Sequence, residues 1–349
     1  MDSTLTGFGK APVLCQVENY ERFLSKPPFC TDSYHQQLIK EEIMKTNSVG
    51  IIGMGWVGSS VANSILQQGV CRELLLNDVK EEIAEGEAMD LNHGSPFYAS
   101  ANVRAVSQEE MLDCDVIVFT AGRGGESDES RLELLNQNMK IVRSVSEKLK
   151  GFEGILIVVT NPVDVITYYF QKLTGIPKHR VIGTGTMLDT ARLMDIVGDK
   201  IKVDSKSIKA EVIGEHGDSE VVLWSKSLVG NTPLQSWEGW KSEYEDEIAE
   251  QVKNAAYEII SRKGATNHAI GMVTATLINW LMRNENRITT VSSVIDGAYG
   301  LKDVALSLPC LISSSGIERV LESEISYKEM ENLQKSAGVI REAIESVEG

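Results

Sequence analysis

The chain has 349 residues, of which 42% are hydrophobic and 24% charged, a composition typical of a globular protein large enough for two domains. Its formal net charge of −16 disfavours partners such as nucleic acid or an anionic membrane surface, because both would repel it. The five cysteines form no C-x-x-C pair, and no apolar run approaches the ~20 residues of a membrane span. A disulfide framework, a metal site and a membrane segment are therefore not expected.

Residues 1–47 are interpreted as an N-terminal arm. A short helix is predicted there, beginning at Asp32 or Ser33 and ending at Met44. The first 46 residues contain six acids and a single arginine, unlike a transit or secretory signal, so a cytoplasmic location is expected. The arm could pack on its own body or on a neighbouring subunit, and the sequence leaves both open.

From Ser48 onward, short apolar strands alternate with helices. The predicted strands are Val49–Ile52, Leu74–Leu76, Val116–Thr120 and Ile155–Thr160, and the predicted helices are Trp56–Gln68, Glu81–Leu91 and Arg131–Leu149. Continuous apolar strands between helices indicate a parallel sheet that is covered on both faces. Residues 48–185 are therefore predicted to form an α/β domain with a Rossmann-type, doubly wound parallel sheet.

After about Gly185 the pattern changes to a mixture of helices and strands. Helices are predicted at Met187–Val197, Lys241–Lys263, Asn267–Met282 and from Lys328, and strands at Ile208–Ile213, Glu220–Trp224, Thr289–Ile295 and Ala305–Leu311. This order is typical of an α+β arrangement. Residues 186–349 are therefore predicted to form a C-terminal α+β domain.

A glycine-rich turn, Gly53–Gly58, follows the first predicted strand and begins a helix. In the G-x-G-x-x-G pattern, Gly53 allows the tight turn, Gly55 lets the backbone approach a pyrophosphate, and Gly58 lets helix and strand pack closely. Asp78 ends the second strand, where a carboxylate accepts hydrogen bonds from ribose hydroxyls and repels a 2′-phosphate. The pattern predicts NAD rather than NADP, against the simpler interpretation of a glycine turn and a capping aspartate.

One histidine, His216, lies in a turn rich in glycines and acids, Gly214–Ser219, where an imidazole can titrate near neutral pH. Upstream, Asp189 and Arg192 share one face of a predicted helix. They could form a simple surface ion pair. Beside His216, however, the carboxylate would orient the imidazole, and the guanidinium would bind a substrate carboxylate bidentately.

Two further residues follow predicted strands. Asn161 comes after Ile155–Thr160, at the carboxyl edge of the sheet, where ligands bind in such folds. Arg131 follows a polar, glycine-rich loop and begins a helix. A cation is poorly placed at a helix N-terminus, which indicates a use other than capping.

With these residues in place, the chain resembles the L-lactate/malate dehydrogenase family of NAD-dependent 2-hydroxy-acid dehydrogenases over about residues 48–347. The motifs that carry the resemblance are Gly53–Gly58, Thr120–Gly122, Glu129–Arg131, Asn161–Asp164, Leu188–Arg192, Gly214–Ser219 and Lys263–Thr266. The resemblance implies a small 2-oxo or 2-hydroxy acid as the substrate. It also implies assembly as a homodimer or homotetramer.

The resemblance implies a role for each site residue. His216 would be the proton donor and acceptor, Asp189 its partner, and Arg192 the anchor of the substrate carboxylate. Arg131 would polarise the carbonyl from a closing loop, and Asn161 would bind the reacting oxygen and the nicotinamide region. The implied cofactor-binding residues are Gly53, Gly55, Val57, Gly58, Asp78, Thr120, Ala121, Gly122, Asn138, Asn161 and Thr184.

The substrate side chain is implied to meet Thr266 and the loop before Arg131. At the loop position where lactate enzymes have glutamine and malate enzymes arginine, this chain has Gly125, followed by Glu126. Since glycine supplies no cation and Glu126 would repel a second carboxylate, malate is disfavoured, although Arg123 leaves that alternative open. The space favours a bulky apolar 2-oxo acid, aromatic or branched, with pyruvate as the alternative. A non-enzymatic NAD-binding protein is disfavoured, because it would be marked by loss of His216, Asp189 or Arg131.

Overall fold

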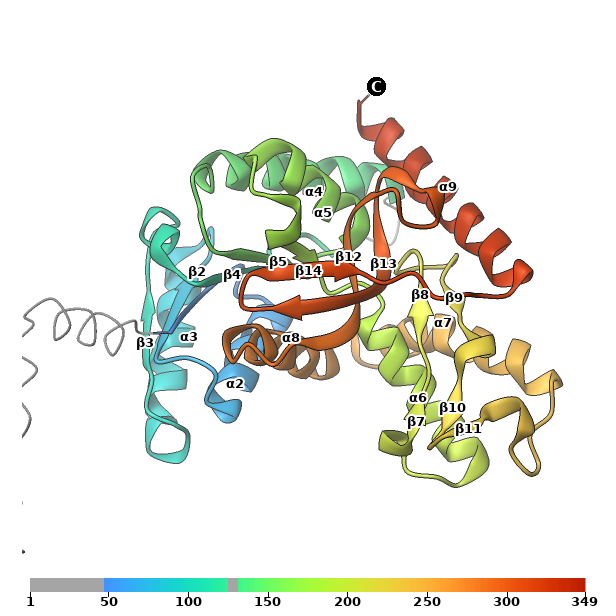
Figure 1. The fold of residues 1–349 in the computed structure, drawn as a ribbon. Coiled ribbons are helices and arrows are strands. Elements are labelled where there is room, and N and C mark those ends of the chain that lie inside the picture. The colour runs from blue at the N-terminus through green and yellow to red at the C-terminus, as the bar shows by residue number, and fades with distance from the viewer. Residues whose placement is uncertain (1–46, 125–130, 349) are drawn as a thin grey trace, which may run out of the picture. The chain divides into compact units, whose positions relative to one another are not determined.

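A nine-stranded sheet organises the part of the chain that the computed structural model describes, residues 47–124 and 131–348 (Figure 1). Its parallel part consists of β1 (Ser48–Ile52), β2 (Glu73–Asn77), β3 (Asn102–Ala105), β4 (Val116–Phe119), β5 (Ile155–Val158) and β6 (Val181–Gly183). These strands lie in the order β3-β2-β1-β4-β5-β6, with parallel pairing throughout. This is the order of the doubly wound dinucleotide-binding fold, so the predicted Rossmann-type sheet is confirmed.

Helices cover both faces of this sheet. One face carries α2 (Trp56–Gln68), α3 (Glu81–His93) and α8 (His268–Met282), and the other α4 (Arg131–Lys148), α5 (Val163–Thr174) and α9 (Tyr327–Glu348). In Figure 1, α4 and α5 lie above the strands, and α2 and α8 lie below them. The strands are apolar on both sides because both sides are buried: every residue of β4 and β5 is buried.

The sheet continues into the C-terminal part of the chain. Three antiparallel strands extend it: β12 (Arg287–Asp296), β13 (Lys302–Ser313) and β14 (Gly316–Val320). The junction is a single antiparallel pairing of Ser292 on β12 with Gly183 on β6. The sequence predicts strands at Thr289–Ile295 and Ala305–Leu311 but not their place in this sheet, because an apolar run does not specify its neighbour.

A separate layer of helices and short strands packs around a hydrophobic cluster of its own. It contains α6 (Met187–Ile201), α7 (Glu243–Lys263), β7 (Ile208–Lys209), β8 (Val212–Ile213), β9 (Val221–Val222), β10 (Leu228–Val229) and β11 (Thr232–Pro233). The predicted strand Ile208–Ile213 is divided, because β7 pairs with β10 while β8 pairs with β9. The predicted strand Glu220–Trp224 shortens to β9, since a 3-10 turn begins at Trp224.

Some sequence expectations fall outside the described residues. All but the last residue of the predicted arm 1–47, including the helix predicted from Asp32 or Ser33, is among them, and so is Gly125. The sequence pattern does not predict β3, α5 and β6, of which the two strands are only four and three residues long. Within the described residues, no helix is both long and apolar enough to cross a membrane.

The crossing of α2 and α8 provides a test of this packing. A Cβ atom on Gly271 of α8 would lie 2.7 Å from the backbone oxygen of Ser60 on α2, so Gly271→Ala must push two helices apart. We expect a loss of about 1–3 kcal/mol in the free energy of unfolding, measured by urea denaturation. The matched control is Gly86→Ala on α3, where a Cβ atom meets nothing within 4 Å. That variant should be more stable by about 0.5–1 kcal/mol, and equal effects of the two substitutions would contradict this packing.

Candidate active site

His216, Asp189 and Arg192 lie together where the loop after β8 meets the first turn of α6. The imidazole Nδ1 of His216 lies 2.5 Å from Oδ2 of Asp189. The guanidinium Nη1 of Arg192 donates to the other oxygen, Oδ1, at 2.8 Å. The side chain of Asp189 is 3% exposed, against 21% for His216 and 14% for Arg192. The structure thus brings His216, 27 residues away in the sequence, beside the Asp189–Arg192 pair of α6, around one buried carboxylate.

A glycine turns the chain so that His216 can reach α6. Gly214 has φ +88°, in the left-handed region that favours glycine, and its backbone exchanges two hydrogen bonds with Ser307 of β13. A Cβ atom at this position would lie 2.6 Å from Oγ of Ser336 on α9. The close approach of α9 and the positive φ both require a residue without a side chain.

The N-terminus of α6 is tied to β8 by side chains. Thr186, just before the helix, donates from Oγ1 to the carbonyl oxygen of Val212 at 2.5 Å, and Val212 N donates to Oγ1 of Thr190 at 3.0 Å. Thr186 is fully buried. These bonds hold the helix turn that carries Asp189 in register with the strand that leads to His216.

The buried ion cluster decides the charge of the imidazole. Burial alone would lower the pKa of His216, but the charge of Asp189 and its hydrogen bond outweigh burial and, with Asp164, raise the pKa to about 9. Burial opposes ionisation of Asp189, yet the His216 imidazolium and then the Arg192 guanidinium hold its pKa below 3.8. At neutral pH His216 is therefore protonated, with a proton available on Nε2 because Nδ1 faces Asp189.

Glu220 adds an acid that sequence reasoning missed. Burial, and then the charge of Asp189, raise the pKa of Glu220 to about 8. Its Oε1 atom is buried and has no hydrogen-bond partner among the described residues. In the sequence, its position four residues after His216 is the feature that points to a place near this site. At pH 7 this carboxyl is largely neutral, so it does not compete for the positive charge of Arg192.

The glycine-rich loop shows three different reasons for its glycines. Gly53 has φ +102°, and a Cβ atom there would lie 2.5 Å from the backbone of Ala121. A Cβ atom on Gly58 would lie 2.0 Å from the carbonyl oxygen of Gly53. A Cβ atom on Gly55, the N-cap of α2, would meet nothing within 4 Å, and no side chain caps this end of the helix. The open backbone at this helix N-terminus fits the pyrophosphate of a dinucleotide.

The other residues implied to bind the cofactor lie near this loop, at the carboxyl ends of the parallel strands. Asp78 accepts from Met54 N at 2.8 Å, and about four lone-pair sites on a carboxylate leave acceptors for ribose hydroxyls. Thr120 donates from Oγ1 to the Gly53 oxygen at 2.6 Å. A Cβ atom on Gly122 would lie 2.5 Å from Thr160, so this loop also needs a glycine.

Asn138 joins the loops after β4 and β5. Its Oδ1 accepts from Arg123 N at 2.9 Å, and its Nδ2 donates to the carbonyl oxygen of Asn161 at 3.3 Å. Asn161 itself is exposed, Val57 is half-buried, and Thr184 is buried, with its backbone N–H bonded to Val158. The residues at this edge fit an NAD molecule that extends from Asp78 toward Asn161.

Three predicted substrate residues are less completely placed. Arg131 is the first residue of α4, and its side chain is outside the described part of the structure, as is the whole of Gly125. Thr266 is half-buried in the connection between α7 and α8. Their roles stay predictions.

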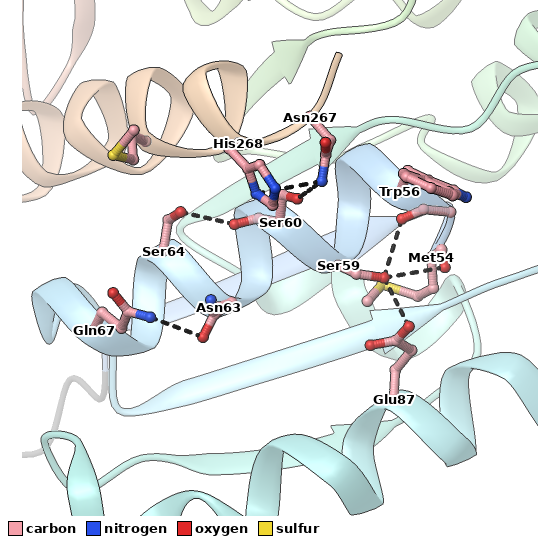
Figure 2. A pocket seen from close by; sticks show the side chains of 12 residues that line it. Met54, Trp56, Ser59, Ser60, Asn63, Ser64, Gln67, Glu87, Asn267 and His268 are labelled. Atoms are coloured by element: carbon pink, nitrogen blue, oxygen red, sulfur yellow. Dashed lines mark hydrogen bonds between the residues drawn. The ribbon is translucent and has the colours of Figure 1, made fainter. Parts of the chain in front are cut away.

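A cavity of about 650 Å³ lies beside the glycine-rich loop (Figure 2). Its walls come from the loop, α2, α3 and α8; the polar side chains that line it are Ser59, Ser60, Asn63, Ser64, Gln67, Glu87, Asn267 and His268. Figure 2 shows Ser59 bonded to Glu87, at 2.7 Å, and Asn267 bonded to Ser60, at 2.8 Å. His216, Asp189 and Arg192 do not line this cavity, so they are proposed as the catalytic residues because of their chemistry and not because of a cavity.

Several solved structures and curated proteins are similar to this chain. The crystal structure of a lactate dehydrogenase from a Medee basin deep-sea metagenome library has a TM-score of 0.84 at 38% identity, and the match covers 88% of this chain and 100% of that one. The minor L-lactate dehydrogenase of Enterococcus mundtii, in a ligand-bound form, has a TM-score of 0.84 at 36% identity, with 86% and 98% covered. The L-lactate dehydrogenase of Clostridium perfringens is 38% identical over 304 residues, 85% of this chain and 96% of that protein.

Family models account for nearly all of the chain that follows the N-terminal arm. The lactate/malate dehydrogenase NAD binding domain matches residues 47–183, and the lactate/malate dehydrogenase alpha/beta C-terminal domain matches residues 186–349. The resemblance found in the sequence and the prediction of NAD as the cofactor are both confirmed. The chain therefore belongs to the lactate/malate dehydrogenase family and is an NAD-dependent oxidoreductase that acts on a CH–OH group.

Proposed function

We propose that this protein is an L-lactate dehydrogenase that reversibly reduces pyruvate to L-lactate. The observation that carries the proposal is the Asp189 carboxylate, bound on one oxygen to His216 and on the other to Arg192. A charged imidazole and a guanidinium on one buried acid provide a proton donor beside an anchor for a carboxylate. A 2-oxo acid needs both groups.

The choice of pyruvate corrects the preference expected from the sequence. A bulky apolar 2-oxo acid was favoured because Gly125 leaves space, but Gly125 lies outside the described residues. The similar proteins are named L-lactate dehydrogenase, which supports the pyruvate alternative and gives no support to a bulky substrate. The proposal therefore adopts pyruvate.

The charges of the cluster suit a small monocarboxylate. With Asp189 ionised and both His216 and Arg192 protonated, these three groups carry one net positive charge. A guanidinium has five N–H donors, enough for Asp189 and for a bidentate substrate carboxylate together. Glu220 is largely neutral at pH 7, so it adds no negative charge that would oppose a substrate carboxylate at Arg192.

In the reduction, Arg192 holds the substrate carboxylate, and the Nε2 atom of His216 donates its proton to the carbonyl oxygen. Bound NADH supplies the hydride that the carbonyl carbon receives. Asp189 keeps the ring oriented and stabilises its charged form before the transfer. In the reverse direction, neutral His216 takes the hydroxyl proton through the same atom. Arg131 and Asn161 are proposed to stabilise the negative charge that develops on the oxygen.

Further parts of the proposal concern organisation. The two family-model matches support a division into an NAD-binding domain, residues 48–185, and a substrate domain, residues 186–349. Assembly as a homodimer or homotetramer and a cytoplasmic location stay predictions.

The first test removes the proton donor. His216→Asn keeps a polar side chain but cannot deliver a proton, so kcat for pyruvate reduction should fall by about 100- to 10,000-fold. NADH affinity, measured by fluorescence titration, should stay close to that of the wild type. The control is His93→Asn, at the exposed C-terminal end of α3. Near-normal turnover of His216→Asn would refute the assignment.

The pH profile tests the Asp189–His216 pair. Because the proton donor is lost as pH rises through about 9, kcat/KM for pyruvate should fall above that pH, while lactate oxidation should gain. Asp189→Asn removes the charge that raises the pKa of His216, so the decline should begin about 1–3 pH units lower. Asp195→Asn, on the exposed side of α6, is the matched control. An unshifted profile in Asp189→Asn would contradict the pairing.

The substrate is tested by comparing kcat/KM for pyruvate, phenylpyruvate, 2-oxoisocaproate and oxaloacetate with saturating NADH. Pyruvate should be preferred over the two larger apolar acids by about tenfold or more, since even one extra methylene group in a hydrophobic pocket is discriminated to that extent. A preference for phenylpyruvate or 2-oxoisocaproate would restore the bulky-substrate hypothesis. A preference for oxaloacetate would indicate a malate enzyme.

A further inference from the structure

Asp164 is a buried acid with no role in the proposed mechanism. It lies in the first turn of α5 and is 3% exposed. Its Oδ2 accepts the backbone N–H of His216 at 2.8 Å, and its Oδ1 accepts the hydroxyl of Ser292, on β12, at 2.5 Å. Each carboxylate oxygen therefore binds a donor from a different part of the fold.

These contacts differ from those of an ordinary helix-capping acid. An aspartate at the start of a helix usually accepts from backbone N–H groups of its own first turn. The bonds of Asp164 go instead to the turn Gly214–Ser219 that carries His216, here called the catalytic loop, and to β12, a strand far away in the sequence. Because a buried carboxylate is costly unless its oxygens are satisfied, this arrangement ties three segments to one point.

The position of Asp164 in the chain connects two parts of the site. Asn161 follows the carboxyl end of β5, and Asp164 comes three residues after Asn161. Its bond to the backbone of His216 therefore fixes the catalytic loop relative to the strand end that carries Asn161. Asp189 holds the ring of His216 from α6, whereas Asp164 holds its backbone from α5.

We propose that Asp164 is a positioning residue that fixes the backbone of His216 and adds a second negative charge beside its imidazole. The inference rests on the proposed function, in which His216 donates the proton. The charged or titratable groups around this point are Asp189 and Arg192 on α6, His216 and Glu215 in the catalytic loop, and Glu220 before β9.

The ionisation of Asp164 links this role to pH. Burial raises the pKa of Asp164 to about 6, while the Ser292 hydroxyl and the backbone N–H of His216 act in the opposite direction. In turn, the ionised Asp164 raises the pKa of His216. Below pH 6 the ring of His216 stays protonated, but protonation of Asp164 weakens its hydrogen bond to the backbone of His216. Pyruvate reduction should therefore decline on the acid side because the ring is positioned less well.

The test replaces Asp164 by an isosteric amide. Asp164→Asn keeps one acceptor for the backbone of His216 but removes the charge, as protonation does in the wild type. We expect kcat for pyruvate reduction to fall by about tenfold with little change in NADH affinity. The decline of activity at acid pH, the acid limb of the pH profile, should disappear. The alkaline limb should move down by about 0.5–1 pH unit. The matched control is Asp115→Asn. Asp115 is a partly buried aspartate that accepts from Ser48 N at 3.0 Å, at the amino ends of the parallel strands and away from the candidate site.

Two further measurements keep the result decisive. If Asp164→Asn does not fold, Ser292→Ala takes its place. Loss of the hydroxyl raises the pKa of Asp164, so the acid limb should move up by about 0.5–1 pH unit, with kcat at pH 8 within about threefold of the wild type.

NMR titration of the His216 ring reports its pKa without turnover, so a wild type inactive on pyruvate would overturn the proposed function but leave this inference testable. An unchanged His216 pKa and pH profile in Asp164→Asn, or an unmoved acid limb in Ser292→Ala, would overturn it.

Discussion

The hydrogen bond between His216 Nδ1 and the buried carboxylate of Asp189, 2.5 Å long, is the interaction on which the rest of the site depends. The charge of Asp189, together with this bond and the charge of Asp164, raises the pKa of the imidazole to about 9 despite burial, so the ring is protonated at neutral pH. The bond also leaves Nε2 free of Asp189. The same carboxylate binds Arg192, so the proposed proton donor and the proposed carboxylate anchor are held by one side chain.

The scaffold keeps this small cluster rigid by connecting elements that do not neighbour one another in sequence. Gly214 pairs with β13, Thr186 bonds to β8, and Asp164 joins α5 to the loop that carries His216 and to β12. Hydride transfer needs reacting atoms to be held in a narrow range of geometry. A loop that is bonded to a doubly covered sheet holds its side chains in such a geometry better than a loop that is held only by its own turn.

Local pattern was enough for much of the fold and of the site. The apolar strands, the glycine turn at Gly53–Gly58 and Asp78 predicted a Rossmann-type sheet and NAD, because each feature needs only neighbours a few residues away. The division of Ile208–Ile213 into two strands was missed, since β7 and β8 owe their separation to different partners. Glu220 was missed because burial, not residue type, raises its pKa.

The sequence by itself determined the residue types of the site and their order: a helix face with Asp189 and Arg192, and a glycine-flanked turn with His216. Only the tertiary structure decided that one carboxylate joins these two segments, that β12 continues the parallel sheet at β6, and that Asp164 reaches the backbone of His216. The physical reason is that spacing along the chain encodes helix faces and strand periods. Contacts between distant segments depend instead on packing, burial and the removal of water, which act through the whole fold.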